Sequence, residues 1–165
     1  MADLKTFLHG LPAFERFSDR QLDALIAQLR IETHAPETVL LRQHEQGQAL
    51  YLVLSGAIRV TYQDASGNEA SDVHEARVGE IIGRLSLIPN LPSPVTCTAA
   101  EEIIVARLAP EQYHALFLLA PAVAHQFQYM VAAQLAHYLQ IKNQALRQRL
   151  VRRPPTSLLE RLFGV

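Results

Sequence analysis

Residues 39–60 read VLLRQHEQGQALYLVLSGAIRV, and this stretch decides the fold class. Its β-rich runs, at residues 39–41, 49–54 and 57–60, are separated by a polar loop that contains Gly47 and by the pair Ser55 and Gly56. Short runs rich in β-branched and aromatic residues, bounded by turn residues, are typical of strands. The stretch therefore predicts three successive β-strands.

The same alternation of short apolar runs and turn residues extends over residues 31–108. Strands at such regular spacing predict a small antiparallel barrel or sandwich. On the N-terminal side, residues 1–33 show helical periodicity, and Ser18 is the predicted N-cap of a helix with apolar residues at 22, 25, 26 and 29. On the C-terminal side, the helical period returns at residue 110, and Pro121 is predicted to begin a long helix.

These segments predict one domain, because 165 residues are too few for two domains of ordinary size. The domain is expected to cover residues 1–153, with helices over 1–33, a β-barrel over 34–109 and C-terminal helices over 110–153. Residues 154–165 are expected to form a short basic and amphipathic tail. The predicted fold class is mainly β with flanking helices.

The β region resembles the cyclic-nucleotide-binding domain family, which includes the sensor half of catabolite-activator-type regulators. Residues 39–60 match the family's order of a strand, a Gly-rich turn, an aromatic-apolar strand ending in Ser-Gly, and a further strand. Residues 77–99, RVGEIIGRLSLIPNLPSPVTCTA, are similar to the family's phosphate-binding cassette, whose pattern is FGELAL, a spacer and PRAATV. The resemblance covers about residues 5–140 and implies a β-barrel or jelly-roll fold with N-terminal helices and a long C-terminal helix.

The resemblance implies a ligand site within the cassette. Its residues are Ile82, Gly83, Arg84, Leu85, Ser86, Ser93, Pro94, Val95 and Thr96. In the family, a glutamate accepts a hydrogen bond from the ribose 2′-hydroxyl, an arginine pairs with the cyclic phosphate, and the next amide donates to the same phosphate. Arg84, Ser93 and Pro94 stand at these three positions. Arginine has no acceptor, serine forms no bidentate pair, and proline has no N–H.

The cassette nevertheless keeps residues that shape its backbone. A short helix is predicted to begin near Gly83, where glycine permits a close backbone approach and helix N–H groups favour an anion. Three interpretations remain open: a degenerate pocket that binds cAMP and cGMP weakly or not at all, an anion site in which Arg84 supplies the charge from the opposite side, or cyclic-nucleotide binding in an unexpected pose. None of them requires a cofactor.

No catalytic or metal-binding motif is present in the sequence. The seven histidines do not lie at metal-ligand spacing from Cys, Asp or Glu, apart from the chance neighbours Glu45 and Glu75. The single cysteine, Cys97, excludes an intrachain disulfide, and its strand-like surroundings predict a buried structural thiol. The chain is therefore predicted not to be an enzyme.

The long helix carries an apolar stripe at spacings of three and four residues. Its members are Val131, Leu135, Tyr138, Leu139, Leu146 and Leu150. The stripe is expected to extend past the barrel beyond about residue 138, where it needs another partner. In regulators of this family the equivalent helix pairs with its twin, so the resemblance implies a homodimer built on residues 131–150.

Charge is unevenly distributed along the chain. Residues 142–165 hold six basic side chains and one acidic side chain, whereas residues 1–141 hold nine basic and fifteen acidic ones. The basic end predicts weak, salt-sensitive contact with polyanions or a membrane surface, without sequence specificity. Only 12 residues follow Arg153, too few for a helix-turn-helix domain, so sequence-specific DNA binding is not expected. The N-terminus lacks an apolar signal region, and a cytoplasmic location is expected.

Together these features predict a non-catalytic regulatory sensor or pseudo-sensor module that acts through dimerisation or a partner protein. Two alternatives remain. One is a regulator that responds to a cyclic nucleotide or another anion through Arg84. The other is the sensor part of a catabolite-activator-type transcription regulator without its helix-turn-helix.

Overall fold

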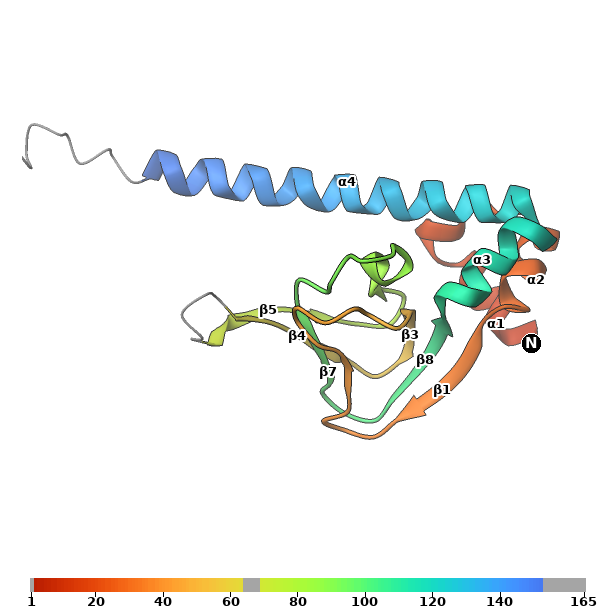
Figure 1. The fold of residues 1–165 in the computed structure, drawn as a ribbon, viewed down its shortest axis with the longest axis horizontal. Coiled ribbons are helices and arrows are strands. Elements are labelled where there is room, and N and C mark those ends of the chain that lie inside the picture. Colours follow the sequence, from red (N-terminus) through yellow and green to blue (C-terminus); the bar gives the residue numbers. More distant parts are fainter. Residues whose placement is uncertain (1, 64–68, 153–165) are drawn as a thin grey trace, which may run out of the picture. The chain divides into compact units, whose positions relative to one another are not determined.

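The computed structural model describes residues 2–63 and 69–152 (Figure 1). The chain divides into two compact units, Met1–Phe127 and Gln128–Val165. The first unit contains two antiparallel sheets and the helices that precede the long helix α4 (Pro121–Arg152), together with the first residues of α4. Within the described residues, no helix is both long and apolar enough to cross a membrane.

Two short helices and a 3-10 turn form the N-terminal part of the first unit. They are α1 (Ala2–His9), η1 (Pro12–Phe14) and α2 (Asp19–Ile26). The predicted N-cap is confirmed, because the Ser18 hydroxyl accepts from the Gln21 N–H while the Gln21 side chain accepts from the Ser18 N–H at 2.8 Å. Leu22 and Leu25 on the inner face of α2 are buried.

The helical prediction for residues 30–33 is wrong. These residues belong to strand β1 (Arg30–His34), which pairs antiparallel with β8 (Ile103–Leu108) from Arg30 opposite Arg107 to His34 opposite Ile103. Helix α2 ends at Ile26. Residues 30–34 then pair with β8, and this pairing satisfies the backbone N–H and C=O groups that a longer helix would have paired internally.

The remaining strands are short. They are β2 (Val39–Leu41), β3 (Leu50–Ser55), β4 (Ile58–Gln63), β5 (Glu69–Ala76), β6 (Ile81–Ile82) and β7 (Thr96–Ala99). One sheet has the order β1-β8-β3-β6 and the other β2-β7-β4-β5, with every pair antiparallel. Helices α1 and α2 and the later helix α3 (Pro110–Leu119) gather at one end of the sheets, and the β4–β5 hairpin lies at the other (Figure 1).

The mainly β fold with flanking helices is confirmed, and its architecture is of the jelly-roll class. The predicted β-barrel over residues 34–109 is not closed, because β1 and β2 end their separate sheets instead of pairing with each other. The turn between β1 and β2 carries the chain from one sheet to the other, so the two sheets face each other as a sandwich.

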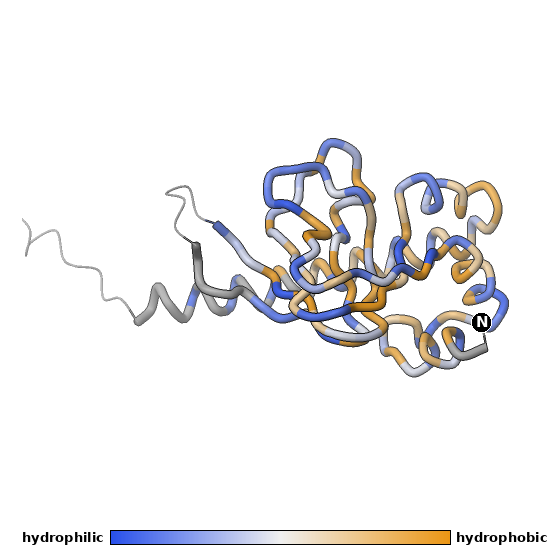
Figure 2. Tube along the Cα trace, turned by 90° about the horizontal axis from the view of Figure 1, so that it is seen from below, coloured by the Kyte–Doolittle hydropathy of each residue, from blue (hydrophilic) through white to orange (hydrophobic). Residues whose placement is uncertain are grey.

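The core of the first unit lies between the two sheets. Inward-facing residues of β3, β4, β7 and β8 fill it, among them Val53, Ile58, Cys97, Ile103 and Val105, each at most 1% exposed. In Figure 2 the hydrophobic stretches run through the middle of this unit, and several of its outer loops are hydrophilic. The alternation of burial along the strands is what a half-buried sheet requires.

The prediction of a buried thiol at Cys97 is confirmed, and burial raises its pKa from the ordinary 9.0 to about 12. The thiol is therefore neutral at physiological pH, and alkylation by iodoacetamide at about pH 8 should be much slower in the native protein than in urea.

Because the thiol of the unfolded chain ionises at lower pH than the buried thiol, the free energy of unfolding should fall as pH rises from about 9 to about 12. Equal alkylation rates in the native and unfolded protein would contradict this account.

The C-terminal helices begin at prolines, as the sequence predicts for the long one. Helix α3 (Pro110–Leu119) lies against the short turn at residues 84–87, and α4 begins at Pro121. The first turns of α4 bury Val123, Ala124 and Phe127 in the first unit. The Phe127 ring centroid lies 6.1 Å from that of Tyr113 on α3.

Candidate functional site

The first half of the cassette turns sharply after β6. Gly83 has a φ of +71°, and a Cβ there would lie 2.5 Å from the Ala49 carbonyl oxygen, so glycine is required both by conformation and by space. The predicted short helix is confirmed as a single 3-10 turn, η2 (Arg84–Leu87). Its hydrogen bonds run from the Ser86 N–H to the Gly83 oxygen and from the Ile88 N–H to the Leu85 oxygen, each at 3.0 Å.

The second half of the cassette is held by the β2–β3 loop, residues 42–49. The His44 N–H donates to the Ser93 carbonyl oxygen and the Ser93 N–H donates to the Glu45 carbonyl oxygen, both at 2.8 Å. The Gln43 N–H donates to the Thr96 hydroxyl at 3.1 Å. These bonds fix residues 93–96 beside the loop that precedes β3.

Both halves of the cassette meet the same segment of chain. Leu41 lies against the turn at Gly83, and Gly47 lies against the Ser86 side chain so closely that a Cβ on Gly47 would overlap the hydroxyl. The structure therefore brings residues 82–86 and 93–96 together around residues 41–49.

Ser93 stands where the resemblance implies a phosphate-binding arginine, and its side chain is engaged locally. The residue is buried, and its hydroxyl donates to the Val95 carbonyl oxygen at 2.7 Å while it accepts from the Val95 N–H at 3.4 Å. This arrangement closes the turn around the exposed Pro94. Position 93 therefore contributes no positive charge to the cassette. A serine used in this way stabilises the loop instead of presenting a charge to a ligand.

The other predicted site residues fall into two groups by burial. Ile82 and Ser86 are buried, and Gly83, Arg84, Leu85, Val95 and Thr96 are half-buried. Arg84 opens η2 and interacts with another group of the protein. The apolar members of the set thus pack into the scaffold, and the one cation of the set is held at the start of the turn.

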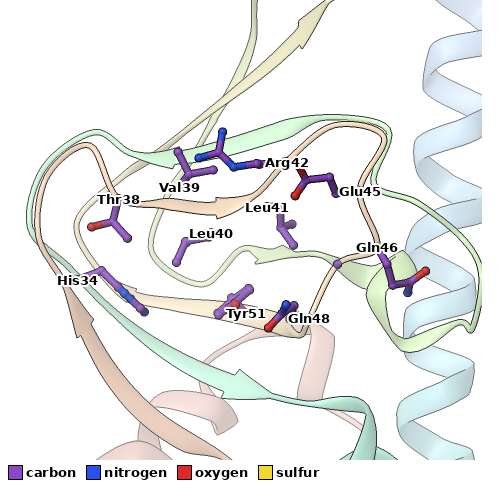
Figure 3. Close-up of a pocket in the computed structure, with 11 residues that line it drawn as sticks. His34, Thr38, Val39, Leu40, Leu41, Arg42, Glu45, Gln46, Gln48 and Tyr51 are labelled. Atoms are coloured by element: carbon purple, nitrogen blue, oxygen red, sulfur yellow. The ribbon is translucent and has the colours of Figure 1, made fainter.

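A hollow of about 290 Å³ opens beside β2 (Figure 3). We call it the edge hollow, and its lining includes His34, Leu40, Leu41, Gly47, Gln48 and Tyr51. Among the described residues that line it, none belongs to the cassette halves 82–86 and 93–96. No sequence motif predicts this site, although its lining lies within residues 34–51, from the end of β1 through β2 and the β2–β3 loop to β3.

A chain of polar contacts adjoins the edge hollow. His34 Nε2 lies 3.2 Å from Glu32 Oε2, and Glu32 Oε1 lies 3.8 Å from Arg107 Nε. Arg107 donates to the Gln48 backbone carbonyl oxygen at 3.5 Å. Burial raises the pKa of Tyr51, and the neighbouring Arg107 guanidinium partly opposes that rise. The Tyr51 hydroxyl is therefore protonated at neutral pH.

Two further histidines pair with carboxylates at the surface. His9 Nε2 lies 2.9 Å from Asp19, and His74 Nε2 lies 2.7 Å from Glu80. Across residues 2–63 and 69–152, no three His, Cys, Asp or Glu side chains form a group that could hold a metal ion.

The predicted dimer stripe lies on α4. Val131 and Leu135 are half-buried, and Leu139 is 59% exposed. The side chains of the other three members, Tyr138, Leu146 and Leu150, lie outside the described part of the structure, as does the tail at residues 154–165.

Comparison with known proteins adds a family assignment. Residues 31–118 match the family model described as "Cyclic nucleotide-binding domain". The chain is 27% identical over 128 residues to the Cyclic AMP receptor protein of Thermus thermophilus, covering 78% of this chain and 59% of that protein. It is 30% identical over 117 residues to the cAMP-dependent protein kinase regulatory subunit of Candida albicans, covering 71% of this chain and 24% of that protein.

Solved structures share the fold. The crystal structure of the Thermus thermophilus Catabolite Activator Protein superposes with a TM-score of 0.71 at 28% identity, covering 83% of this chain and 62% of that one. A cyclic nucleotide-binding domain from Methylobacillus flagellatus superposes with a TM-score of 0.71 at 20% identity, covering 93% and 83%. The chain thus spans about three fifths of the Thermus relative and a smaller part of the kinase regulatory subunit.

Proposed function

The chain belongs to the cyclic nucleotide-binding domain family, and from this premise we propose that it is a non-catalytic regulatory sensor or pseudo-sensor module. Its affinity for cAMP and cGMP is weak or lost, and it acts through dimerisation or a partner protein. The regulatory relatives, a Cyclic AMP receptor protein and a kinase regulatory subunit, support the sensor role.

The observation that carries the proposal is the position of Ser93. Its hydroxyl is buried and bonded to Val95, where recognition of a cyclic phosphate calls for a cation. Pro94 adds no N–H donor, and Arg84 adds no acceptor for a ribose hydroxyl. A charge-assisted hydrogen bond contributes about 1.5–3 kcal/mol, so the loss of two such anchors lowers affinity by about two to four orders of magnitude.

A thermal-shift panel tests this function on the intact protein. Cyclic mononucleotides, cyclic dinucleotides and simple anions are each added in excess, since a ligand at 100 times its dissociation constant stabilises the folded state by about 2.7 kcal/mol. The proposal predicts no shift with cAMP or cGMP at micromolar concentration. A shift with another anion that is lost in Arg84→Gln would instead support the second interpretation, in which Arg84 supplies the charge.

The similarity to the Cyclic AMP receptor protein supports a second candidate function, the sensor part of a transcription regulator. The two candidates predict different native genes. A gene that continues past Val165 into a helix-turn-helix would favour the transcription regulator, and one that stops there would favour the partner-protein module.

We further predict that the protein is a homodimer through α4. Leu139 is 59% exposed on the apolar stripe, and an exposed stripe of this kind gains stability by pairing with a second copy. Sedimentation at roughly tens of micromolar should give a dimer, and the double variant Leu139→Asp, Leu146→Asp should give a monomer. The control Gln140→Asp, Gln144→Asp introduces the same charges off the stripe and should remain dimeric. A monomeric wild-type protein would refute the prediction.

A further inference from the structure

Helix α4 has an exposed face whose positions follow alternating steps of three and four residues. In its middle part these positions are Tyr129, Ala132, Ala136, Leu139 and Asn143. The same steps run back to Ala122 and His125, which are also exposed, and in the sequence they continue to Leu146 and Leu150. We call this face the α4 seam. Such steps are the heptad pattern by which two helices pack side by side.

The α4 seam differs from the apolar stripe predicted from the sequence. Val131 and Leu135 belong to that stripe, but they are half-buried and lie off the seam. Tyr129 is 61% exposed and Leu139 is 59% exposed, and both lie on the seam. The seam is therefore the face of α4 that is open to a partner.

The length of the seam fits a weak interface between two helices. From position 122 to position 150 an α-helix rises about 42 Å, and its width is about 10–12 Å. Two helices paired along this length bury about 900 Å² in total, which is close to the roughly 1,000 Å² of a small specific interface.

The polar groups of the seam are complementary to themselves. The Asn143 amide and the Tyr129 hydroxyl each hold a donor and an acceptor, so each can bond to the same group of a second copy. No residue from Gln112 to Ile141 carries a formal charge, so this part of the seam meets no charge repulsion from a second copy. A second copy of the chain is therefore the partner that this face fits.

Asn143 lies between Leu139 and Leu146 in the order of seam positions, and it is the one amide among them. Parallel pairing in register places it against the second copy's Asn143, where the two amides satisfy each other. A shift of one heptad would place it against Leu150 or Ala136, which offer no hydrogen bond from their side chains. An amide at such a position specifies the register of two helices at some cost in stability.

We propose that Asn143 determines how two copies pair, with α4 of each copy packed along the seam, parallel and in register, and the two Asn143 amides bonded to each other. The inference rests on the homodimer of the proposed function and adds the face, the direction and the register of that dimer. It holds whether or not the cassette binds a cyclic nucleotide.

Cysteine crosslinking of the full chain tests the direction of pairing. In the parallel register, two Leu146→Cys side chains meet across the seam and should form an interchain disulfide in a glutathione redox buffer. In antiparallel pairing centred on position 136 they would lie about 30 Å apart, which no disulfide spans. The control Gln144→Cys places a thiol off the seam and should crosslink at least fivefold less. The native Cys97 is buried and should stay reduced.

The variant Asn143→Leu tests the register. It replaces the paired amides with apolar side chains, so the helices should associate at least threefold more tightly but in mixed registers and directions. Sedimentation should then show species larger than a dimer, and the disulfide yield of Leu146→Cys should fall at least twofold in this background. The control Gln144→Leu adds the same side chain off the seam and should change neither result.

Salt gives a second measure of direction. Parallel pairing brings together two basic ends, each with six basic side chains and one acidic side chain from residue 142 on. Screening of their repulsion should lower the dimer dissociation constant at least threefold between about 50 mM and about 500 mM NaCl. Antiparallel pairing would direct each basic end towards the acidic part of the other copy, so salt would raise that constant.

Three results would overturn the proposal. A wild-type protein that is monomeric at roughly tens of micromolar would refute this inference and the dimer together, and would leave the partner-protein form of the function. A dimer without a disulfide at Leu146→Cys, or one weakened by salt, would refute the parallel register alone. An Asn143→Leu variant that forms the wild-type dimer unchanged would refute the role of Asn143. Tight cAMP binding would refute the weak-affinity cassette and leave this inference standing.

Discussion

The triple substitution Arg84→Glu, Ser93→Arg, Pro94→Ala is expected to raise the affinity for cAMP at least tenfold, or about 1.4 kcal/mol. It restores an acceptor for the ribose hydroxyl, a cation for the phosphate and an amide donor next to that cation. Because the three groups converge on one ligand, the triple variant should gain more than any of the single variants. Calorimetric titration of each variant measures the effect.

The structure shows why the single substitution Ser93→Arg should gain least. Ser93 is buried and its hydroxyl closes the turn to Val95, so the larger side chain must leave that position before it can meet a phosphate. The matched control replaces Ser93→Arg in the triple variant with Ser93→Lys, which restores the charge but not the bidentate geometry and should gain less. A folded triple variant with wild-type affinity would refute the assignment of the three positions.

Phe127→Ala is expected to cost about 3–5 kcal/mol of the free energy of unfolding. Phe127 is 2% exposed, and its ring packs near Tyr113 of α3, so truncation leaves a large cavity where α3 meets the start of α4. The control Leu118→Ala removes a side chain that is 86% exposed and should change stability by less than about 0.5 kcal/mol. Urea unfolding measures both, and a loss below about 1 kcal/mol for Phe127→Ala would show that the helices do not depend on this contact.

Much of the fold is readable from local signals. The Ser18 cap, the start of α4 at Pro121 and the turn at Gly83 each depend on the chemistry of a few adjacent residues, and all three predictions are confirmed. The strand pattern of residues 39–60 predicts β2, β3 and β4 because alternating burial and tight turns leave a regular trace in the sequence.

Features that depend on distant pairing could not be predicted in this way. Arg30–His34 becomes a strand because β8, some seventy residues later, supplies its partner. The open edge between β1 and β2 likewise results from sheet order and not from local pattern.

The candidate site also has some features that follow from local sequence and others that depend on distant contacts. Motif order predicts where the cassette lies and which three positions differ, because those predictions need only local matches. The burial of Ser93 and its bond to Val95 depend on how the β2–β3 loop holds residues 93–96, which the sequence does not display. The lining of the edge hollow lies within the single stretch 34–51, but how this stretch folds back depends on the pairing of β1 and β3 with the distant β8.

Calorimetric titration of the wild-type protein with cAMP and cGMP tests the central claim most directly. A cassette without its arginine, its amide donor and its glutamate should bind both nucleotides no more tightly than the high micromolar range, if at all. Dissociation constants at or below about 1 μM, corresponding to about 8 kcal/mol of binding free energy, would contradict the account and would assign the phosphate to Arg84 or to a residue outside the cassette.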